Sequence, residues 1–232
     1  MQDSSPQRPI AYTLRVLAAL LRYPDAAFRA AVPELQEALD REAALPLPRV
    51  LELHALLQRL QREDAFITEA EFVELFDRGR STALHLFEHV HGDSRDRGPA
   101  MVDLTQTYER AGLLLDPGEL PDHLPVVLEF ASTQPPQSAA AFLAEFAHIL
   151  RAIFSALQRR NSAYASVLAA LLELAGERAE AVEIPPEPAL DDSWAEPEVF
   201  AGCASPGQSR PGEAQPVHIV RKQPSNASGA LA

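Results

Sequence analysis

Side chains of the types that bind metal ions crowd into one short stretch of the chain, at His85, Glu88, His89 and His91. His85 and His89 are four residues apart, so a helix would place both imidazoles on one face, where they could share a metal ion. The order differs from the H-E-x-x-H zinc motif because Glu88 directly precedes the second histidine. No further cluster of ligands accompanies them. We therefore expect histidines on a helix surface or at a helix cap, and no metal site.

A second candidate for chemistry is the pair Asp122–His123, which could transfer protons. General acid–base catalysis needs a placed nucleophile or substrate, and no G-x-S-x-G, P-loop or G-x-G-x-x-G motif occurs. An Asp–His pair without such partners is typical of a structural or binding role. We expect a protein that is not an enzyme and holds no cofactor. The alternative is a metal- or nucleotide-dependent enzyme built around His85, His89 and His123.

The segment from His91 to Gly98 mixes acidic and basic side chains between two glycines. Its arginines, with Arg78 and Arg80, alternate with nearby carboxylates. Two interpretations stay open. The charges either neutralise one another and hold a loop, at little gain per exposed pair, or they form the polar wall of a groove for a peptide. The segment consists of His91, Gly92, Asp93, Ser94, Arg95, Asp96, Arg97 and Gly98.

Composition predicts a helical protein with an acidic surface. Of 232 residues, 47% are hydrophobic but only 6% aromatic, and alanine and leucine dominate, which favours an all-α domain. The net charge is −13, and the absence of a basic stripe argues against nucleic acid as a partner. The N-terminus lacks the basic region of a signal peptide, and no apolar run approaches the ~20 residues of a membrane span. We expect a cytoplasmic protein with no inserted membrane segment.

The composition changes near Arg178, where proline and glycine become frequent and apolar periodicity ends. We predict a compact all-α domain over residues 1–178 and a largely disordered, flexible acidic tail over residues 179–232. The only tryptophan, Trp194, could anchor this tail to its own domain or to a partner. The only cysteine, Cys203, also lies there, so no intrachain disulfide is possible.

Within the first 178 residues, prolines separate stretches with helical apolar spacing. Pro33, Pro48, Pro99 and Pro125 are predicted to open helices, and Thr68–Glu71 forms a capping box. Further helices are expected over residues 12–22, 84–90 and 163–175, the last ending at Gly176. Residues 138–159 predict the longest helix, whose thin polar stripe indicates a central, mostly buried position.

Two blocks of this chain resemble one protein family. Residues 74–104, from Glu74-Leu75-Phe76-Asp77-Arg78-Gly79-Arg80 through Phe87-Glu88-His89-Val90-His91-Gly92-Asp93 to Asp103-Leu104, are similar to the core of the NarJ family. The segment Glu119-Leu120-Pro121-Asp122-His123-Leu124-Pro125 is similar to its next motif. Leu20–Pro24 also fits, and the tail is the loosest match. One departure is Phe72, where the family usually carries a tyrosine.

These NarJ-family proteins are nitrate reductase molybdenum cofactor assembly chaperones, also called the delta subunit, and are related to the TorD/DmsD redox-enzyme chaperones. The resemblance implies a compact multi-helix fold. It also implies a partner, the apo catalytic (alpha) subunit of membrane-bound respiratory nitrate reductase, bound partly through its N-terminal segment. The chaperone would allow insertion of the molybdenum cofactor, delay membrane docking and leave the finished enzyme. The alternative is a helical chaperone or scaffold for another molybdoenzyme client.

The resemblance also implies where a client peptide binds. The Glu-x-Pro-Asp-His pattern associated with leader-peptide binding in the wider group falls on Glu119, Pro121, Asp122 and His123. A basic, amphipathic leader would suit an acidic groove. We expect an acidic rim made by Glu119, Asp122 and Asp103. The expected apolar floor comprises Phe76, Tyr108, Leu120 and Phe130.

Overall fold

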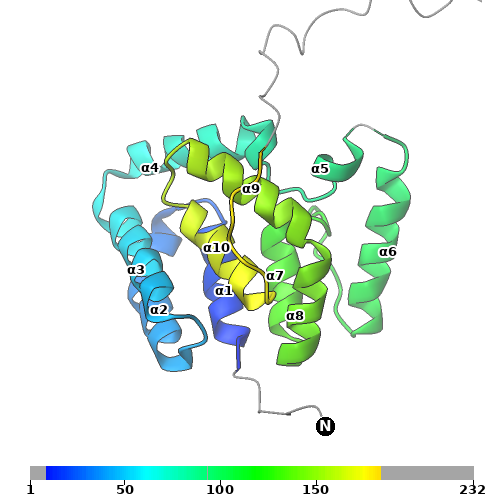
Figure 1. Ribbon diagram of the computed structural model, residues 1–232, viewed down its shortest axis with the longest axis horizontal. Helices are drawn as coiled ribbons and strands as arrows, with labels where there is room; N and C mark the ends of the chain where they lie inside the picture. The colour runs from blue at the N-terminus through cyan, green and yellow to red at the C-terminus, as the bar shows by residue number, and fades with distance from the viewer. Residues whose placement is uncertain (1–8, 93, 184–232) are drawn as a thin grey trace, which may run out of the picture. The chain divides into compact units, whose positions relative to one another are not determined.

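The computed structural model describes residues 9–92 and 94–183, and over this part of the chain the secondary structure is helical, without a named strand (Figure 1). The prediction of an all-α fold is confirmed. The α-helices are α1 (Ala11–Leu20), α2 (Ala26–Glu42), α3 (Leu47–Arg62), α4 (Ala65–Phe72), α5 (Glu88–His91), α6 (Arg97–Arg110), α7 (Leu124–Ser132), α8 (Pro136–Glu145), α9 (Ala147–Arg159) and α10 (Ala165–Leu174). A π-helical turn, η1 (Val73–Asp77), and a 3-10 turn, η2 (Arg80–Thr82), follow α4.

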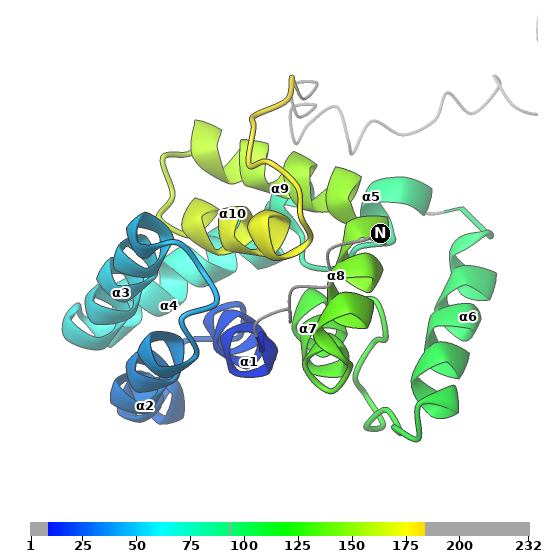
Figure 2. The ribbon, with the colours of Figure 1, turned by 60° about the horizontal axis from the view of Figure 1, so that its bottom comes forward.

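Helix α1 lies at the centre of the packed helices, in contact with α2, α7 and α10 (Figure 2). Its Leu14, Leu17 and Leu20 are fully buried, because the apolar spacing places them on faces that meet these neighbours. Helices α9 and α10 pack against each other over the same core, and Leu150 and Leu168 are inaccessible to solvent. Burial of this leucine-rich core is the main contribution to stability.

The prediction of one long helix over residues 138–159 is wrong in one respect, because the helix is interrupted at Phe146. Helices α8 and α9 meet there at 69°, and Phe146 has φ −94° and ψ 2°, outside regular helical geometry. The residue is buried, with its ring 5.4 Å from that of Phe142 and 6.5 Å from that of Phe87. The break lets α8 contact α7 and α9 contact η2, while both halves pack against α10.

Two further local predictions are corrected. Thr68 does not cap a helix: α4 begins at Ala65, and the Asp64 carboxylate accepts hydrogen bonds from the N–H groups of Phe66 and Ile67. Pro33 lies inside α2, which Asp25 caps. Pro99 lies in the first turn of α6, which begins at Arg97, so this helix opens at its proline as predicted.

The predicted helix over residues 84–90 is only the short α5, so His85 and His89 do not share a helix. Pro48 and Pro125 stand in the first turns of α3 and α7, as predicted. Helix α10 ends before Gly176, whose φ of +80° suits the predicted C-cap.

The proposed boundary at residue 178 and the disorder beyond it stay predictions. Residues 175–183 continue from α10, and the Val182 N–H donates to Ser155 Oγ on α9 at 2.9 Å. Trp194 and Cys203, like most of the predicted tail, lie outside the described residues. Across residues 9–92 and 94–183, no single helix is long and apolar enough to cross a membrane; α8 and α9 reach the required length only as a bent pair.

Candidate functional site

Two segments that are far apart in the sequence lie side by side. An isolated antiparallel bridge joins His85 to His123. The Leu86 N–H donates to the Asp122 carbonyl at 3.0 Å, and the Leu124 N–H donates to the Leu84 carbonyl at 2.9 Å. These bonds join the middle of the first family-like block to the Glu119–Pro125 segment, where α7 begins.

Asp122 is fully buried beneath this bridge. Its Oδ2 accepts a hydrogen bond from the Phe87 N–H at 3.1 Å and lies 3.6 Å from Nη2 of Arg97. Its Oδ1 lies 3.5 Å from Nδ1 of His85. A buried carboxylate surrounded by one N–H donor and two cationic or imidazole groups holds the three segments together.

The surroundings shift both pKa values in the directions expected for an ion pair. Burial by itself would raise the pKa of Asp122, but the His85 imidazole, the Phe87 N–H and the Arg97 guanidinium together bring it below its ordinary value. The Asp122 carboxylate raises the pKa of His85, against the opposing effect of burial. The cluster therefore favours a charged pair inside the protein.

His123 lies on the other side of the bridge, stacked on His85 with ring centroids 5.0 Å apart. Burial and the neighbouring His85 charge lower the pKa of His123, although Glu119, whose Oε2 lies 3.7 Å from Nδ1, acts in the opposite direction. The stack thus combines His85, whose surroundings favour the protonated imidazole, with His123, whose surroundings favour the neutral one.

Tyr108 fixes the same segment from α6. Its hydroxyl donates to the Pro121 carbonyl at 2.7 Å, and its ring lies 4.6 Å from that of Phe130. Burial raises the pKa of this phenol, so the hydroxyl stays protonated and keeps donating. Phe130 continues the aromatic contacts to Phe142, 5.0 Å away. Helix α6 is thereby attached to α7 and α8 through an aromatic row.

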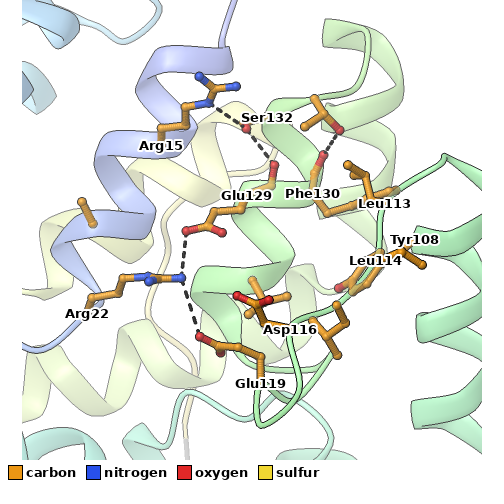
Figure 3. Close-up of a pocket in the computed structure, with 14 residues that line it drawn as sticks. Arg15, Arg22, Tyr108, Leu113, Leu114, Asp116, Glu119, Glu129, Phe130 and Ser132 are labelled. Carbon is orange, nitrogen blue, oxygen red and sulfur yellow. Dashed lines mark hydrogen bonds and ion pairs between the residues drawn. The ribbon is translucent and has the colours of Figure 1, made fainter.

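A cavity of about 700 Å³ opens between α1, α7 and residues 108–119; we call it the α7 cavity (Figure 3). Its walls are apolar at Leu113, Leu114 and Val126, with Tyr108 and Phe130 at the base. Leu114 is 88% exposed. The full lining comprises Arg15, Ala19, Arg22, Tyr108, Leu113, Leu114, Leu115, Asp116, Glu119, Val126, Glu129, Phe130, Ser132 and Thr133.

A second cavity of about 650 Å³ lies over the π-helical turn and the histidine stack; we call it the His85 cavity. Phe72 and Phe76 line it together with the carboxylates of Asp25, Asp77 and Glu88. π-helical turns are frequent at functional sites, and the turn here places Phe76 in this wall. The remaining lining residues are Leu21, Arg22, Tyr23, Gly79, Arg80, Ala83, Leu84, His85, Glu119 and His123.

Arg22 and Glu119 line both cavities and form their shared wall. Nη2 of Arg22 lies 2.9 Å from Oε1 of Glu129 and 3.9 Å from Oε1 of Glu119 (Figure 3). Nearer the N-terminus of α1, Arg15 lines the same α7 cavity and donates to Ser132 Oγ at 3.2 Å (Figure 3). The site therefore has mixed charge, because arginines lie among the carboxylates of the expected acidic groove.

The structure separates the residues that the sequence placed on one rim. Asp122 is buried, so it cannot form part of an acidic rim, and Pro121 is buried beside it. Glu119 lines both cavities, whereas Asp103 is exposed on α6 and lines neither. The reason is that the bridge to His85 turns Asp122 inward, toward Phe87 and Arg97.

The predicted apolar floor is divided in the same way. Tyr108 and Phe130 lie at the base of the α7 cavity, and Phe76 lies in the His85 cavity with His123. Leu120 lines neither of them and is 43% exposed.

In the segment from His91 to Gly98, one side chain reaches the buried cluster. Arg97 contacts Asp122 and lies 3.4 Å from Oε1 of Glu88. Ser94 Oγ accepts from the Asp96 N–H, as in a local turn, while Asp93 lies outside the described residues. This arrangement favours the interpretation of a self-neutralising loop for Arg97. Among residues 9–92 and 94–183, no group of three or more His, Cys, Asp or Glu side chains is arranged to hold a metal ion.

Sequence reasoning missed Arg22, Glu129 and the segment Leu113–Leu115. Arg22 follows the apolar stripe of α1, and Glu129 is a charged residue within the apolar α7. The sequence signal that could have identified them is a charged residue beside a stripe of apolar residues that becomes buried. Nothing in the sequence places one opposite the other.

Comparison with known proteins agrees with this geometry. The model of the nitrate reductase delta subunit family matches residues 22–170, which include Arg22, both family-like blocks and Glu129. The chain belongs to the nitrate reductase delta subunit family. A member of the family from Escherichia coli K12, the nitrate reductase molybdenum cofactor assembly chaperone NarJ, is 46% identical over 162 residues, covering 70% of this chain and 69% of NarJ.

A second relative within the family is the probable nitrate reductase molybdenum cofactor assembly chaperone NarW of the same organism. It is 40% identical over 163 residues, which cover 70% of this chain and 68% of NarW. A solved structure, a putative redox enzyme maturation protein from Archaeoglobus fulgidus, superposes with a TM-score of 0.52 at 18% identity. It covers 76% of this chain and 100% of its own. This likeness concerns the fold alone and confirms the helical architecture.

Proposed function

We propose that this member of the delta subunit family is an assembly chaperone, not an enzyme, for membrane-bound respiratory nitrate reductase. It binds the apo catalytic subunit, partly through that subunit's N-terminal segment. Binding keeps the subunit competent for insertion of the molybdenum cofactor, which is cargo of the client, and delays membrane docking. The chaperone acts in the cytoplasm and leaves before the enzyme is complete.

The observation that carries this proposal is the family match over residues 22–170, supported by 46% identity to a protein named as a nitrate reductase molybdenum cofactor assembly chaperone. The family match includes every residue that lines the two cavities except Arg15, Ala19 and Leu21.

The two cavities support a role in binding a peptide. Each has a volume within the ~300–1,000 Å³ range of ligand pockets, and together they combine apolar walls with carboxylates. An amphipathic segment that bears basic residues would bury its apolar face against Leu113, Leu114 and Val126. Glu119 would face its basic residues from the wall that the cavities share.

The test is calorimetric titration of the full chain with a synthetic peptide from the N-terminus of the catalytic subunit of the respiratory nitrate reductase of the same organism. We expect saturable binding. Glu119→Gln should weaken it about two- to fivefold, the effect of losing one partly exposed charge pair. Asp103→Asn is the matched control, since this acidic residue lies outside both cavities and its change should leave affinity unaltered.

Failure to bind either the peptide or the full apo subunit in a pull-down would refute the proposal. Equal binding of catalytic subunits from several other molybdoenzymes would favour the alternative of a general molybdoenzyme chaperone. Equal losses from Glu119→Gln and Asp103→Asn would keep the function and reject the cavities as its site.

A further inference from the structure

Arg22 holds a special position because it separates the two cavities. It lies just after α1, and its guanidinium reaches Glu129 on α7 at 2.9 Å and Glu119 at 3.9 Å. Figure 3 shows the side chain extending from the end of α1 toward both carboxylates. Arg22 is thus a cation of the protein itself placed on the acidic residues of the proposed client site.

This contact is easy to break. The side chains of Arg22, Glu129 and Glu119 are 46%, 52% and 38% exposed, and exposed ion pairs contribute little to stability. A rotation of the long Arg22 side chain into solvent would leave the two carboxylates without this cation. It would also remove the side chain that divides the α7 cavity from the His85 cavity.

We propose that Arg22 occupies the place of a basic client side chain, and that a lysine or arginine of the client displaces it from Glu129 and Glu119. This inference rests on the proposed function and names the feature of the peptide that the site selects. Arg22 then acts as a specificity-determining residue. A client segment without a basic residue cannot replace the ion pairs that Arg22 makes with Glu129 and Glu119. A basic segment replaces them with ion pairs of its own.

The chemistry around Arg22 defines the segment that fits. On one side Leu113, Leu114 and Val126 offer an apolar surface. On the other side Glu119 and Glu129 remain for a cation once Arg22 has moved. Glu119 also lies near His123, whose Nδ1 is 3.7 Å from Oε2 of Glu119. An amphipathic helix with a basic residue bordering its apolar face satisfies both sides.

The experiment measures the affinity of the full chain for two peptides by calorimetry. One is the N-terminal peptide of the catalytic subunit, and the other is the same peptide with every lysine and arginine replaced by glutamine. Both are titrated into the wild-type protein and into Arg22→Gln. Arg41→Gln is the matched control, because Arg41 pairs with the carboxylate of Glu37 on α2 but lines neither cavity.

We expect Arg22→Gln to bind the basic peptide up to about fivefold more tightly than wild type, since no internal ion pair has to be broken. The neutral peptide should gain less or lose affinity, because it leaves Glu119 and Glu129 unpaired. Salt provides a second readout. Binding of the basic peptide should weaken more steeply with ionic strength in Arg22→Gln, where an ion pair forms without another being lost. Arg41→Gln should behave as wild type.

Weaker binding of the basic peptide to Arg22→Gln would overturn the inference, because Arg22 would then contact the client itself. Equal changes for the two peptides, or the same gain in Arg41→Gln, would also overturn it. In both cases binding by the wild-type protein leaves the proposed function intact. Absence of binding to wild type by the peptide and by the apo subunit would instead refute the proposed function, and the inference with it.

Discussion

Oδ1 of Asp122 lies 3.5 Å from Nδ1 of His85, across the bridge that joins the two family-like blocks. This pair is structural, because Asp122 is fully buried and His85 covers it on the side of the His85 cavity. An acidic residue inside a binding motif is therefore an internal anchor for the segments that form the cavities.

Replacement of Asp122 should destabilise the fold instead of removing a surface charge. We expect Asp122→Asn to lower the free energy of unfolding by about 1–3 kcal/mol, since an amide serves the Phe87 N–H but not both His85 and Arg97. Urea unfolding followed by circular dichroism measures the change. Asp103→Asn, on the exposed face of α6, is the control. Equal stability of the two variants would contradict the anchoring role.

Stability should depend on pH through His85. Its pKa is raised in the folded protein, so the stabilisation that it provides is complete below the unfolded value of about 6.5 and disappears as pH rises through the folded value. The stacked His123 has a lowered pKa and opposes this trend. The comparison is therefore made in a His123→Gln background, where a single imidazole of the stack titrates.

In that background, the free energy of unfolding of the protein that keeps His85 should exceed that of the His85→Gln variant by a margin that grows as pH falls from 8 to 6. Thermal or urea unfolding at several pH values measures it. A difference that stays constant, or that shrinks toward pH 6, would show that the Asp122 carboxylate does not favour the charged imidazole. His148→Gln, an exposed change on α9, controls for the loss of a histidine as such.

Leu114 should matter for binding and not for folding. Its side chain is 88% exposed yet lines the α7 cavity, so a bound apolar segment would bury it. Leu114→Ser should leave the free energy of unfolding within about 0.5 kcal/mol and weaken binding of the N-terminal client peptide about five- to tenfold. Leu51→Ser is the matched control, because Leu51 is 60% exposed on α3 and lines neither cavity. Similar losses of affinity in both variants would argue against the α7 cavity.

Gly79 should tolerate no side chain. It is buried at the wall of the His85 cavity, and an added Cβ would collide with the Thr82 hydroxyl and the Leu75 carbonyl. Because the Leu75 carbonyl is backbone within the π-helical turn and cannot move aside like a side chain, we expect Gly79→Ala to lower the free energy of unfolding by about 1–3 kcal/mol. Gly98→Ala is the matched control, since its Cβ would meet open space. A fully stable Gly79→Ala protein would mean that this turn moves easily.

Much of the fold was accessible from local sequence patterns. The leucine spacing of α1 and α3, Pro125 at the start of α7 and Gly176 after α10 each act within a few residues. Periodicity and helix-end chemistry are local properties, so the sequence predicts them. The break at Phe146 escaped this reasoning because residues 138–159 contain neither proline nor glycine, and the bend depends on contacts with Phe87 and Phe142.

The sequence by itself determined the all-α class, the family resemblance and the importance of the Glu119–His123 segment. Only the tertiary structure decided that Asp122 points inward while Glu119 faces both cavities, although they are three residues apart. Only the tertiary structure also shows that Arg22 contacts Glu129, which is more than a hundred positions further along the chain. The physical reason is that the exposure and partners of a side chain depend on which distant segments pack beside it, and local periodicity carries no record of that packing.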